Sequence, residues 1–401
     1  MARRRVRWGS LDPSLLPYAA KLFAQAFSPV WTTAGAAAAL LGLFAGDGAA
    51  TIGGVLGMAI VADTMRRVLA PHNGFEQAFG PAWDTQIPES RRSRLPHRWN
   101  GYLRPAAPAD VHWDVLYATL PGGRQLLCDV WQPPEGVPTS GVAMIYVHGG
   151  GWQTMDKDSG TRPFFRRLSA QGHVVMDVSY RLCPETDMRG MLGDVKRAVA
   201  WMRGHAADYG ADPNRVVLAG ASAGGHLALL AAYTPHVAAL APDGETLSNT
   251  AVRGVIAWYA PTDLTRYSGD RFPRDWPLFV RVAYRLGMVN SPNHLSWAEL
   301  ERKLLGAPIR EAREQVALLS PITYVGPHCP PTLIIYGTHD GLIPIEDPRS
   351  FYAALRECRV PAVYLELPWV DHAFDMAAPY VSPAAQAAYQ DVEQFLEVMA
   401  G

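Results

Sequence analysis

Short apolar runs recur between residues 111 and 401, and each is about as long as a β-strand. Residues 113–120 and 125–131 flank the turn Pro121-Gly122-Gly123, so this pair predicts a strand hairpin. Six continuous apolar runs follow, separated by helical stretches: 142–147, 173–179, 216–219, 254–259, 332–336 and 363–367. Continuous apolar strands are typical of a mostly parallel sheet with helices on both faces, so the pattern predicts an α/β fold.

The N-terminal region has a different pattern, with two uncharged runs at residues 22–46 and 48–62 that Asp47 separates. Segments that enter a membrane from the cytoplasm carry positive residues on that side. The pattern therefore predicts an apolar N-terminal helical hairpin that associates with a membrane through residues 22–62, with the rest of the chain on the cytoplasmic side. The flanking positive residues are Arg3, Arg4, Arg5, Arg7, Lys21, Arg66 and Arg67.

Three alternatives to the membrane hairpin stay open. They are a soluble helical cap on a cytoplasmic protein, a secretory signal that directs export to the cell envelope, and a single membrane span. The second run is shorter than the roughly 20 residues that a spanning helix needs, which favours the soluble cap. Two GxxxG steps, Gly42 with Gly46 and Gly53 with Gly57, would let two helices approach closely in lipid.

The chain divides into three parts on this pattern. We expect the hairpin at residues 1–70, a connecting segment with short helices at most at 71–110, and a catalytic domain at 111–401. An insertion at about 261–321 is rich in aromatic residues, which suggests either a lid over an apolar pocket or ordinary helix packing. Its aromatic residues are Tyr267, Phe272, Trp276, Phe279, Tyr284 and Trp297.

Composition narrows the classes of function. The 401 residues carry a formal net charge of -1, which gives no electrostatic basis for binding nucleic acid. The four cysteines have no metal-ligand spacing, and the twelve histidines include no HExxH motif, so we expect no metal site.

Ser222 stands in Gly220-Ala221-Ser222-Ala223-Gly224, between the apolar run 216–219 and an alanine-rich helical stretch. A serine that projects its hydroxyl from a sharp strand-to-helix turn needs small neighbours, because larger side chains would clash there. We therefore interpret Ser222 as a nucleophile; the bland alternative is a glycine-rich turn.

Three consecutive glycines follow His148 directly after the run 142–147. Each glycine destabilises ordered structure by roughly 0.5–1 kcal/mol relative to alanine, so three in a row suggest that the loop has a function that requires them. Bare N–H groups there, together with the N–H of Ala223 at a helix start, would stabilise the oxyanion of a tetrahedral intermediate.

In folds where a nucleophilic serine lies on such a strand-to-helix turn, the acid and the histidine base come later in the chain, in the order Ser, acid, His. Asp340 lies just after the run 332–336, and His372 lies just after 363–367. Both therefore fall at strand ends, where side chains from a parallel sheet converge. Other residues are less suitable: Glu346, Asp347 and Asp371 for the acid, and His339, His148 and His226 for the base.

These motifs together resemble the hormone-sensitive-lipase-like family of carboxylesterases over roughly residues 111–398. The resemblance rests on the glycine loop, the serine elbow, the acid and base loops, and two further segments, Tyr180-Arg-Leu-Cys-Pro-Glu185 and Asp212-Pro-Asn-Arg215. It implies an α/β-hydrolase fold with a helical cap, hydrolysis of short- to medium-chain acyl esters without a cofactor, and an oxyanion hole at Gly150, Gly151 and Ala223.

The chain departs from the family pattern at Ala221, where an acidic residue or threonine is frequent, and at Cys183, where alanine is usual. Its motifs also resemble acetyl and feruloyl esterases and aryl-formamidases, so amide or formamide hydrolysis is the main alternative. A peptidase and a non-catalytic binding protein on the same fold are weaker ones. We expect Trp152, Trp258 and Tyr259 to contact a small-molecule ester substrate.

Overall fold

The computed structural model describes residues 16–93, 95, 97–242, 245, 247, 249–267, 297–309 and 311–401. Within them, eight strands form one sheet in the order β1-β2-β4-β3-β5-β6-β7-β8. The strands are β1 (Asp110–Thr119), β2 (Gln125–Gln132), β3 (Ala143–Val147), β4 (Val174–Val178), β5 (Val216–Ala221), β6 (Gly254–Trp258), β7 (Thr332–Gly337) and β8 (Ala362–Leu367).

The predicted, mostly parallel sheet is confirmed. Strand β2 pairs antiparallel with β1 and β4, whereas every pair from β4 across to β8 is parallel. Strands β3 to β7 are buried along their whole length, which explains why they read as continuous apolar runs. All eight predicted strands are present.

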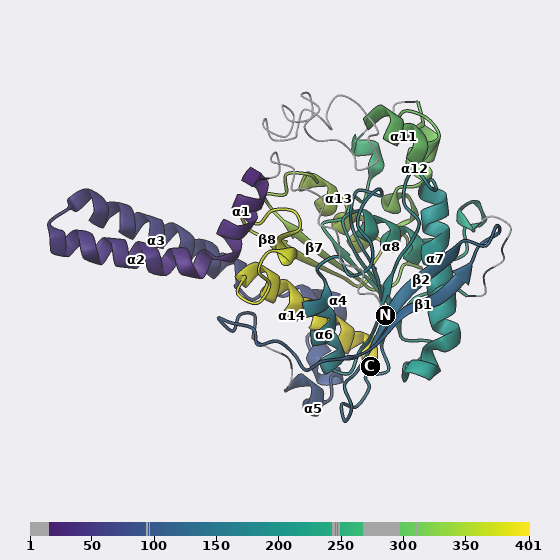
Figure 1. The fold of residues 1–401 in the computed structure, drawn as a ribbon, viewed down its shortest axis with the longest axis horizontal. Helices are drawn as coiled ribbons and strands as arrows, with labels where there is room; N and C mark the ends of the chain where they lie inside the picture. Colours follow the sequence, from purple (N-terminus) through teal and green to yellow (C-terminus); the bar gives the residue numbers. More distant parts are fainter. Residues whose placement is uncertain are drawn as a thin grey trace.

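Helices cover both faces of the sheet (Figure 1). On one face lie α4 (Gly74–Phe79), α6 (Arg162–Ala170) and α14 (Pro383–Ala400), where the rings of Phe164 and Tyr389 stack. On the other lie α7 (Met188–His205), α8 (Ala223–Tyr233) and α13 (Glu346–Glu357), where Tyr233 stacks on Phe351. The helices on both faces thereby hold the ends of strands β5 to β8 in a closely packed core.

The insertion between β6 and β7 is helical where it is described. It contains α11 (Trp297–Leu305) and α12 (Arg313–Leu318), which lie beyond the end of the sheet in Figure 1. Short 3-10 turns complete the chain: η2 (Trp83–Gln86), η3 (Ala206–Tyr209), η4 (Ala238–Leu240), η5 (Leu264–Tyr267), η6 (Pro321–Tyr324) and η7 (Phe374–Met376). Of the predicted lid aromatics, Tyr267 ends η5, Trp297 begins α11, and Phe272, Trp276, Phe279 and Tyr284 lie outside the described residues.

The connecting segment runs back along the catalytic part of the chain. Besides α4 it contains the one-turn helix α5 (Glu89–Arg92). Its Arg98 pairs with the fully buried carboxylate of Asp391 on α14 at 2.9 Å, and His72 lies 3.1 Å from the same carboxylate. These contacts hold the segment against the face that α14 covers.

The N-terminal region forms three helices: α1 (Leu16–Ala26), α2 (Ser28–Ala45) and α3 (Gly48–Val68). The uncharged run 22–46 does not form one helix: the chain breaks at Phe27, and α2 begins at Ser28 with Pro29 in its first turn. The second uncharged run ends at residue 62, but helix α3 continues to Val68, because Asp63 pairs with Arg66 and Arg67 inside the helix. With 21 residues, α3 is about 31 Å long, so it is not too short to cross a bilayer.

Helices α2 and α3 pack through small residues. A Cβ on Gly54 would lie 2.4 Å from the Ala39 nitrogen, and one on Gly42 would lie 2.6 Å from the Thr51 nitrogen. Of the predicted GxxxG glycines, Gly42 is at this contact, but Gly46, Gly53 and Gly57 face open space. The GxxxG spacing alone does not identify the contact glycines, because the rotation of each helix about its own axis decides which glycines face the other helix.

Large apolar side chains are exposed on the hairpin of α2 and α3. The hairpin projects away from the sheet and the helices that cover it (Figure 1). Leu41 is 69% exposed and Phe44 is 85% exposed. Both helices are long and apolar enough to cross a membrane, and only 17% and 6% of their most apolar windows are buried. A helix that is apolar all round is normally buried in protein or lipid, and this hairpin does not lie on the sheet as the soluble-cap alternative requires.

We expect Gly54→Ala to loosen the hairpin by about 1–3 kcal/mol, because the new methyl group has no room against the α2 backbone. Gly53→Ala is the matched control, since that position is open and alanine favours helix. Thermolysin cleavage between residues 28 and 68, measured in a mild detergent, should accelerate in the Gly54 variant and not in the Gly53 variant. Equal cleavage rates in both would contradict the packing.

Candidate active site

Ser222 occupies a sharp turn between β5 and α8. Its φ of 52° and ψ of -122° are unusual for a residue with a side chain, and its N–H donates to the Trp258 carbonyl at 2.8 Å. Gly224 fits beneath the turn because a Cβ there would lie 2.1 Å from the Val147 carbonyl oxygen. The strained turn holds the serine hydroxyl above the carboxyl end of the sheet.

The structure brings the three predicted catalytic residues together. Nε2 of His372 lies 3.0 Å from Oγ of Ser222, and Nδ1 of His372 lies 2.8 Å from Oδ2 of Asp340. Ser222 and His372 are 150 positions apart, but they follow β5 and β8 of the same parallel array. Because parallel strands end at one edge, the fold converges these distant segments.

Asp340 is held from its other oxygen as well. Oδ1 accepts the N–H groups of Leu342 and Ile343, each at 2.8 Å, so the carboxylate is oriented toward His372. Its side chain is 1% exposed and that of His372 is 6% exposed. An ion pair in such a site is little screened by water.

The rival residues have other contacts. Oδ1 of Asp371 accepts the N–H groups of Gly341 and His372, and Asp347 accepts from the Thr262 hydroxyl and N–H. His339 lies against Trp369, with ring centroids 4.3 Å apart. Glu346 begins α13.

The glycine loop after β3 lies beside the nucleophile. A Cβ on Gly149 would be 3.4 Å from the Ser222 Cβ. Gly150 has a φ of +111°, and a side chain there would meet the Thr154 carbonyl oxygen at 2.1 Å; Gly151 has a φ of +58°. The loop thus has a backbone that requires glycine at Gly150, and a positive φ at Gly151 that side chains rarely adopt.

The Tyr180-to-Glu185 segment supports this loop. The Tyr180 hydroxyl donates to the His148 carbonyl at 2.9 Å, and the Cys183 N–H donates to the Trp152 carbonyl at 2.9 Å. Arg181 pairs with the buried Asp194 on α7 at 2.8 Å. The segment 180–185, which contributes to the family resemblance, therefore holds the glycine loop in place.

The three predicted substrate contacts have different surroundings. Trp152 is half-buried and meets the His226 ring edge-on at 5.5 Å. Trp258 is 1% exposed and packs between α6 and α14, against Phe164 and Tyr389. A substrate contact by Trp258 stays a prediction, and its packing gives it a core role.

Tyr259 lies against the catalytic histidine rather than at the surface. Its ring centroid is 4.4 Å from that of His372, and its hydroxyl donates to Asp375 Oδ1 at 2.5 Å. Burial raises the pKa of Asp375, and the tyrosine hydrogen bond opposes that rise. The sequence analysis missed Asp375; a carboxylate three positions after the histidine, in an otherwise apolar segment, is the signal that could have found it.

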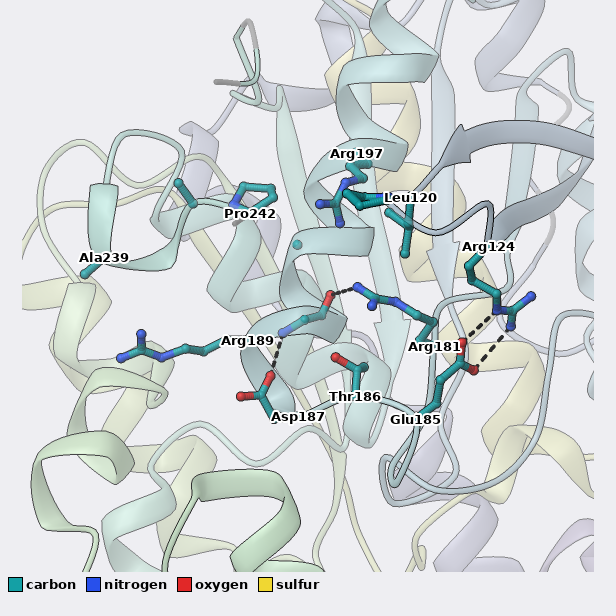
Figure 2. Close-up of a pocket in the computed structure, with 14 residues that line it drawn as sticks. Leu120, Arg124, Arg181, Glu185, Thr186, Asp187, Arg189, Arg197, Ala239 and Pro242 are labelled. Carbon is teal, nitrogen blue, oxygen red and sulfur yellow. Dashed lines mark hydrogen bonds and ion pairs between the residues drawn. The ribbon is translucent and has the colours of Figure 1, made fainter. Parts of the chain in front are cut away.

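A cavity of about 380 Å³ lies near the start of α7, and no triad residue lines it (Figure 2). Arg124 pairs with Glu185, Arg181 with Asp194, and Arg197 with Asp194 and Glu245. These arginine charges are thus balanced by carboxylates and serve the fold. Among the described residues, no group of three His, Cys, Asp or Glu side chains could hold a metal.

Comparison with known proteins places these observations in a family. Residues 128–355 match the BD-FAE family model. Esterase LipQ of Mycobacterium tuberculosis is 32% identical over 343 residues, which is 82% of this chain and 74% of LipQ. The probable carboxylic ester hydrolase LipM of the same organism is 31% identical over 71% of this chain and 60% of LipM.

Solved structures share the fold. The propionate-bound esterase Est2 of Thermogutta terrifontis aligns with a TM-score of 0.55 at 23% identity, covering 72% of this chain and 93% of Est2. At that identity the likeness shows the α/β-hydrolase fold and no more.

Below the site, His226 joins the nucleophile helix to the insertion, and burial lowers its pKa from 6.5 to about 4. Its Nε2 lies 2.7 Å from the Leu319 carbonyl oxygen. The unfolded chain binds a proton between pH 6.5 and 4 and the folded chain does not, so stability is lost as pH falls through that window.

We expect this one group to lower the free energy of unfolding by roughly 2 kcal/mol between pH 7 and pH 5. His226→Gln keeps an N–H donor and removes the titration, so its urea midpoint should fall less on acidification. An equal fall in the variant and the natural chain would contradict the assignment.

Proposed function

Because the chain belongs to the BD-FAE family, a hormone-sensitive-lipase-like group of α/β-hydrolases, we propose that it hydrolyses short- to medium-chain acyl esters through an acyl-enzyme on Ser222. Its relatives LipQ and LipM are named as ester hydrolases, so the chain is a carboxylic ester hydrolase and its reaction is ester hydrolysis. The observation that carries the proposal is the pair of hydrogen bonds that joins Ser222, His372 and Asp340. We assign catalysis to residues 111–401, which include the insertion at about 261–321; residues 268–296 of that insertion lie outside the described residues.

In acylation, Ser222 Oγ attacks the ester carbonyl while His372 Nε2 takes the hydroxyl proton. The new bond is Oγ–C, and the carbonyl π electrons move to the oxygen. As the tetrahedral intermediate collapses, His372 returns the proton to the leaving alkoxide, so an alcohol departs. Asp340 holds the imidazole tautomer that presents Nε2 to the serine and stabilises the imidazolium while it exists.

The oxyanion is stabilised by the N–H groups of Gly150, Gly151 and Ala223. Ala223 begins an 11-residue helix, where the first N–H groups lack partners within the helix and the dipole is positive. Deacylation repeats the steps with water: His372 Nε2 accepts a proton from water while the water oxygen bonds to the acyl carbon. The Oγ–C bond of the resulting tetrahedral intermediate then breaks, Ser222 regains its proton from His372, and the carboxylic acid leaves. No cofactor is required in this scheme.

Apolar or amphipathic esters fit the surroundings of the site. Trp369 is 54% exposed and Met376 is 44% exposed, and both lie on the chain segments that flank His372. The apolar hairpin begins near the same segments, since Gln25 of α1 donates to the Trp369 carbonyl at 2.6 Å. Amide or formamide hydrolysis uses the same triad and is the alternative that the substrate test must separate.

The nucleophile and the substrate class can be tested together. We expect p-nitrophenyl esters from acetate to octanoate to be cleaved, with activity falling for longer acyl chains, and an aryl formamide to be cleaved poorly. Ser222→Ala should abolish turnover because no other residue supplies the nucleophile, and Asp340→Asn should lower kcat by about 10⁴ through the wrong imidazole tautomer. Ester turnover by a folded Ser222→Ala chain would refute the mechanism, whereas formamide turnover without ester turnover would favour the amidase alternative.

We also propose that α2 and α3 insert in a bilayer with the catalytic part on the cytoplasmic side. The supporting features are the exposed apolar surface and the internal satisfaction of polar groups. Hydroxyl groups on the hairpin donate to carbonyls of the preceding turn: Thr32 to Ser28, Thr33 to Val30, Thr51 to Asp47 and Thr64 to Ile60. Groups satisfied in this way cost little in lipid. Asp47 lies at the tip and accepts from Ala49 and Ala50, while Arg66 and Arg67 lie at the base.

Labelling of intact cells tests this placement. Gly48→Cys puts a thiol at the hairpin tip without disturbing the Asp47 cap, and Ala353→Cys puts one on exposed α13 as the matched control. A membrane-impermeant maleimide should label the Gly48 variant and not the Ala353 variant until the cells are opened. The reverse pattern would contradict the orientation, and labelling of both variants only after the cells are opened, with the protein in the soluble fraction, would contradict insertion.

A further inference from the structure

Helix α1 lies directly against the two loops that carry the acid and the base. The Lys21 ammonium donates to Asp371 Oδ2 and, at 3.4 Å, to the His339 carbonyl. Gln25, one helical turn later on the same face, donates to the Trp369 carbonyl at 2.6 Å. One face of α1 therefore binds residues adjacent to both Asp340 and His372.

Asp371 is the junction of these contacts, and its side chain is 2% exposed. Oδ1 accepts the Gly341 N–H at 2.9 Å and the His372 N–H at 2.7 Å, which ties the acid loop to the base loop. Oδ2 is bound by Lys21. A buried carboxylate is costly without a counter-charge, so the position of this junction depends on Lys21.

We propose that Lys21 is a positioning residue for the catalytic reaction, acting through Asp371 to hold His372 and Asp340 in register with Ser222. The inference rests on the proposed function, because it assigns a role toward that same triad. Lys21 has no part in substrate contact or proton transfer. Its effect is on geometry, to which the 3.0 Å contact between His372 and Ser222 is sensitive.

The same geometry links the triad to the hairpin. Only Phe27 separates α1 from α2, so the position of the hairpin and that of Lys21 are mechanically connected. Hairpin insertion would therefore fix α1 against the catalytic loops, and the N-terminal region serves catalysis as well as attachment.

Steady-state kinetics on p-nitrophenyl butyrate with the full-length chain in detergent tests the proposal. Lys21→Ala should lower kcat by about tenfold or more with KM within about twofold, since misplacement by a fraction of an ångström lowers the chemical rate and not substrate binding. Lys21→Arg should restore most of kcat because it restores the charge and the donors. Arg349→Ala, which breaks an exposed ion pair with Glu366 on β8, is the matched control and should keep kcat.

A double-mutant cycle shows whether Lys21 acts through Asp371. Asp371→Ala should lower kcat, and adding Lys21→Ala should lower it no further, because the two residues form one link. Gln25→Ala, which removes only the bond to the Trp369 carbonyl, provides a milder variant if Lys21→Ala does not fold; it should lower kcat by a smaller factor.

Unchanged kcat in folded Lys21→Ala, a loss that Lys21→Arg does not restore, or additive losses in the cycle would each overturn the proposal. These outcomes differ from failure of the proposed function. If the Ser222→Ala chain is inactive while Lys21→Ala is fully active, the triad assignment stands and the role of Lys21 falls. Activity in a folded Ser222→Ala chain would refute the mechanism on which the inference rests.

Discussion

The hydrogen bond between Ser222 and His372 depends on the convergence of parallel strands at one edge of the sheet. Strands β5, β7 and β8 belong to the array β5-β6-β7-β8, and the loops at their carboxyl ends carry the serine, the acid and the base. Strands β5 and β7 are buried on both faces and β8 pairs with β7, so the strand ends move little relative to one another. A rigid sheet is what permits three short loops to hold a hydrogen-bonded chain of side chains.

Around that chain, three buried carboxylates, Asp340, Asp371 and Asp375, each accept hydrogen bonds from groups of neighbouring segments or of their own turn. Asp340 binds two N–H groups of its own turn, Asp371 binds the acid and base loops together, and Tyr259 binds Asp375 beside the histidine ring. Buried carboxylates without such partners would have raised pKa values and would become protonated. The site is thus positioned by a network in which Asp371 has the additional support of the N-terminal helix.

Much of this arrangement could be predicted from the sequence. Strands buried on both faces leave continuous apolar runs, and a serine turn that demands small neighbours leaves Gly220 and Gly224, so the sheet and the candidate triad follow from local pattern. The boundary at Phe27 was missed because an apolar run contains no signal for a break other than Pro29. Lys21 was missed for a different reason: its contact with Asp371 spans 350 positions, which only the tertiary fold establishes. For Asp375 the sequence shows a carboxylate in an apolar segment, but its partner Tyr259, 116 positions away, is known only from the fold.

The central claim is that Ser222 is the nucleophile that forms the covalent intermediate. Reaction of the full chain with paraoxon, followed by peptide mass spectrometry, tests it most directly, because a phosphorylated serine is stable where an acylated one is hydrolysed. The account predicts a single diethylphosphoryl group on the peptide that contains Ser222, with activity lost in proportion to its formation. Complete inactivation with the group on another residue, or full modification of Ser222 without loss of esterase activity, would contradict it.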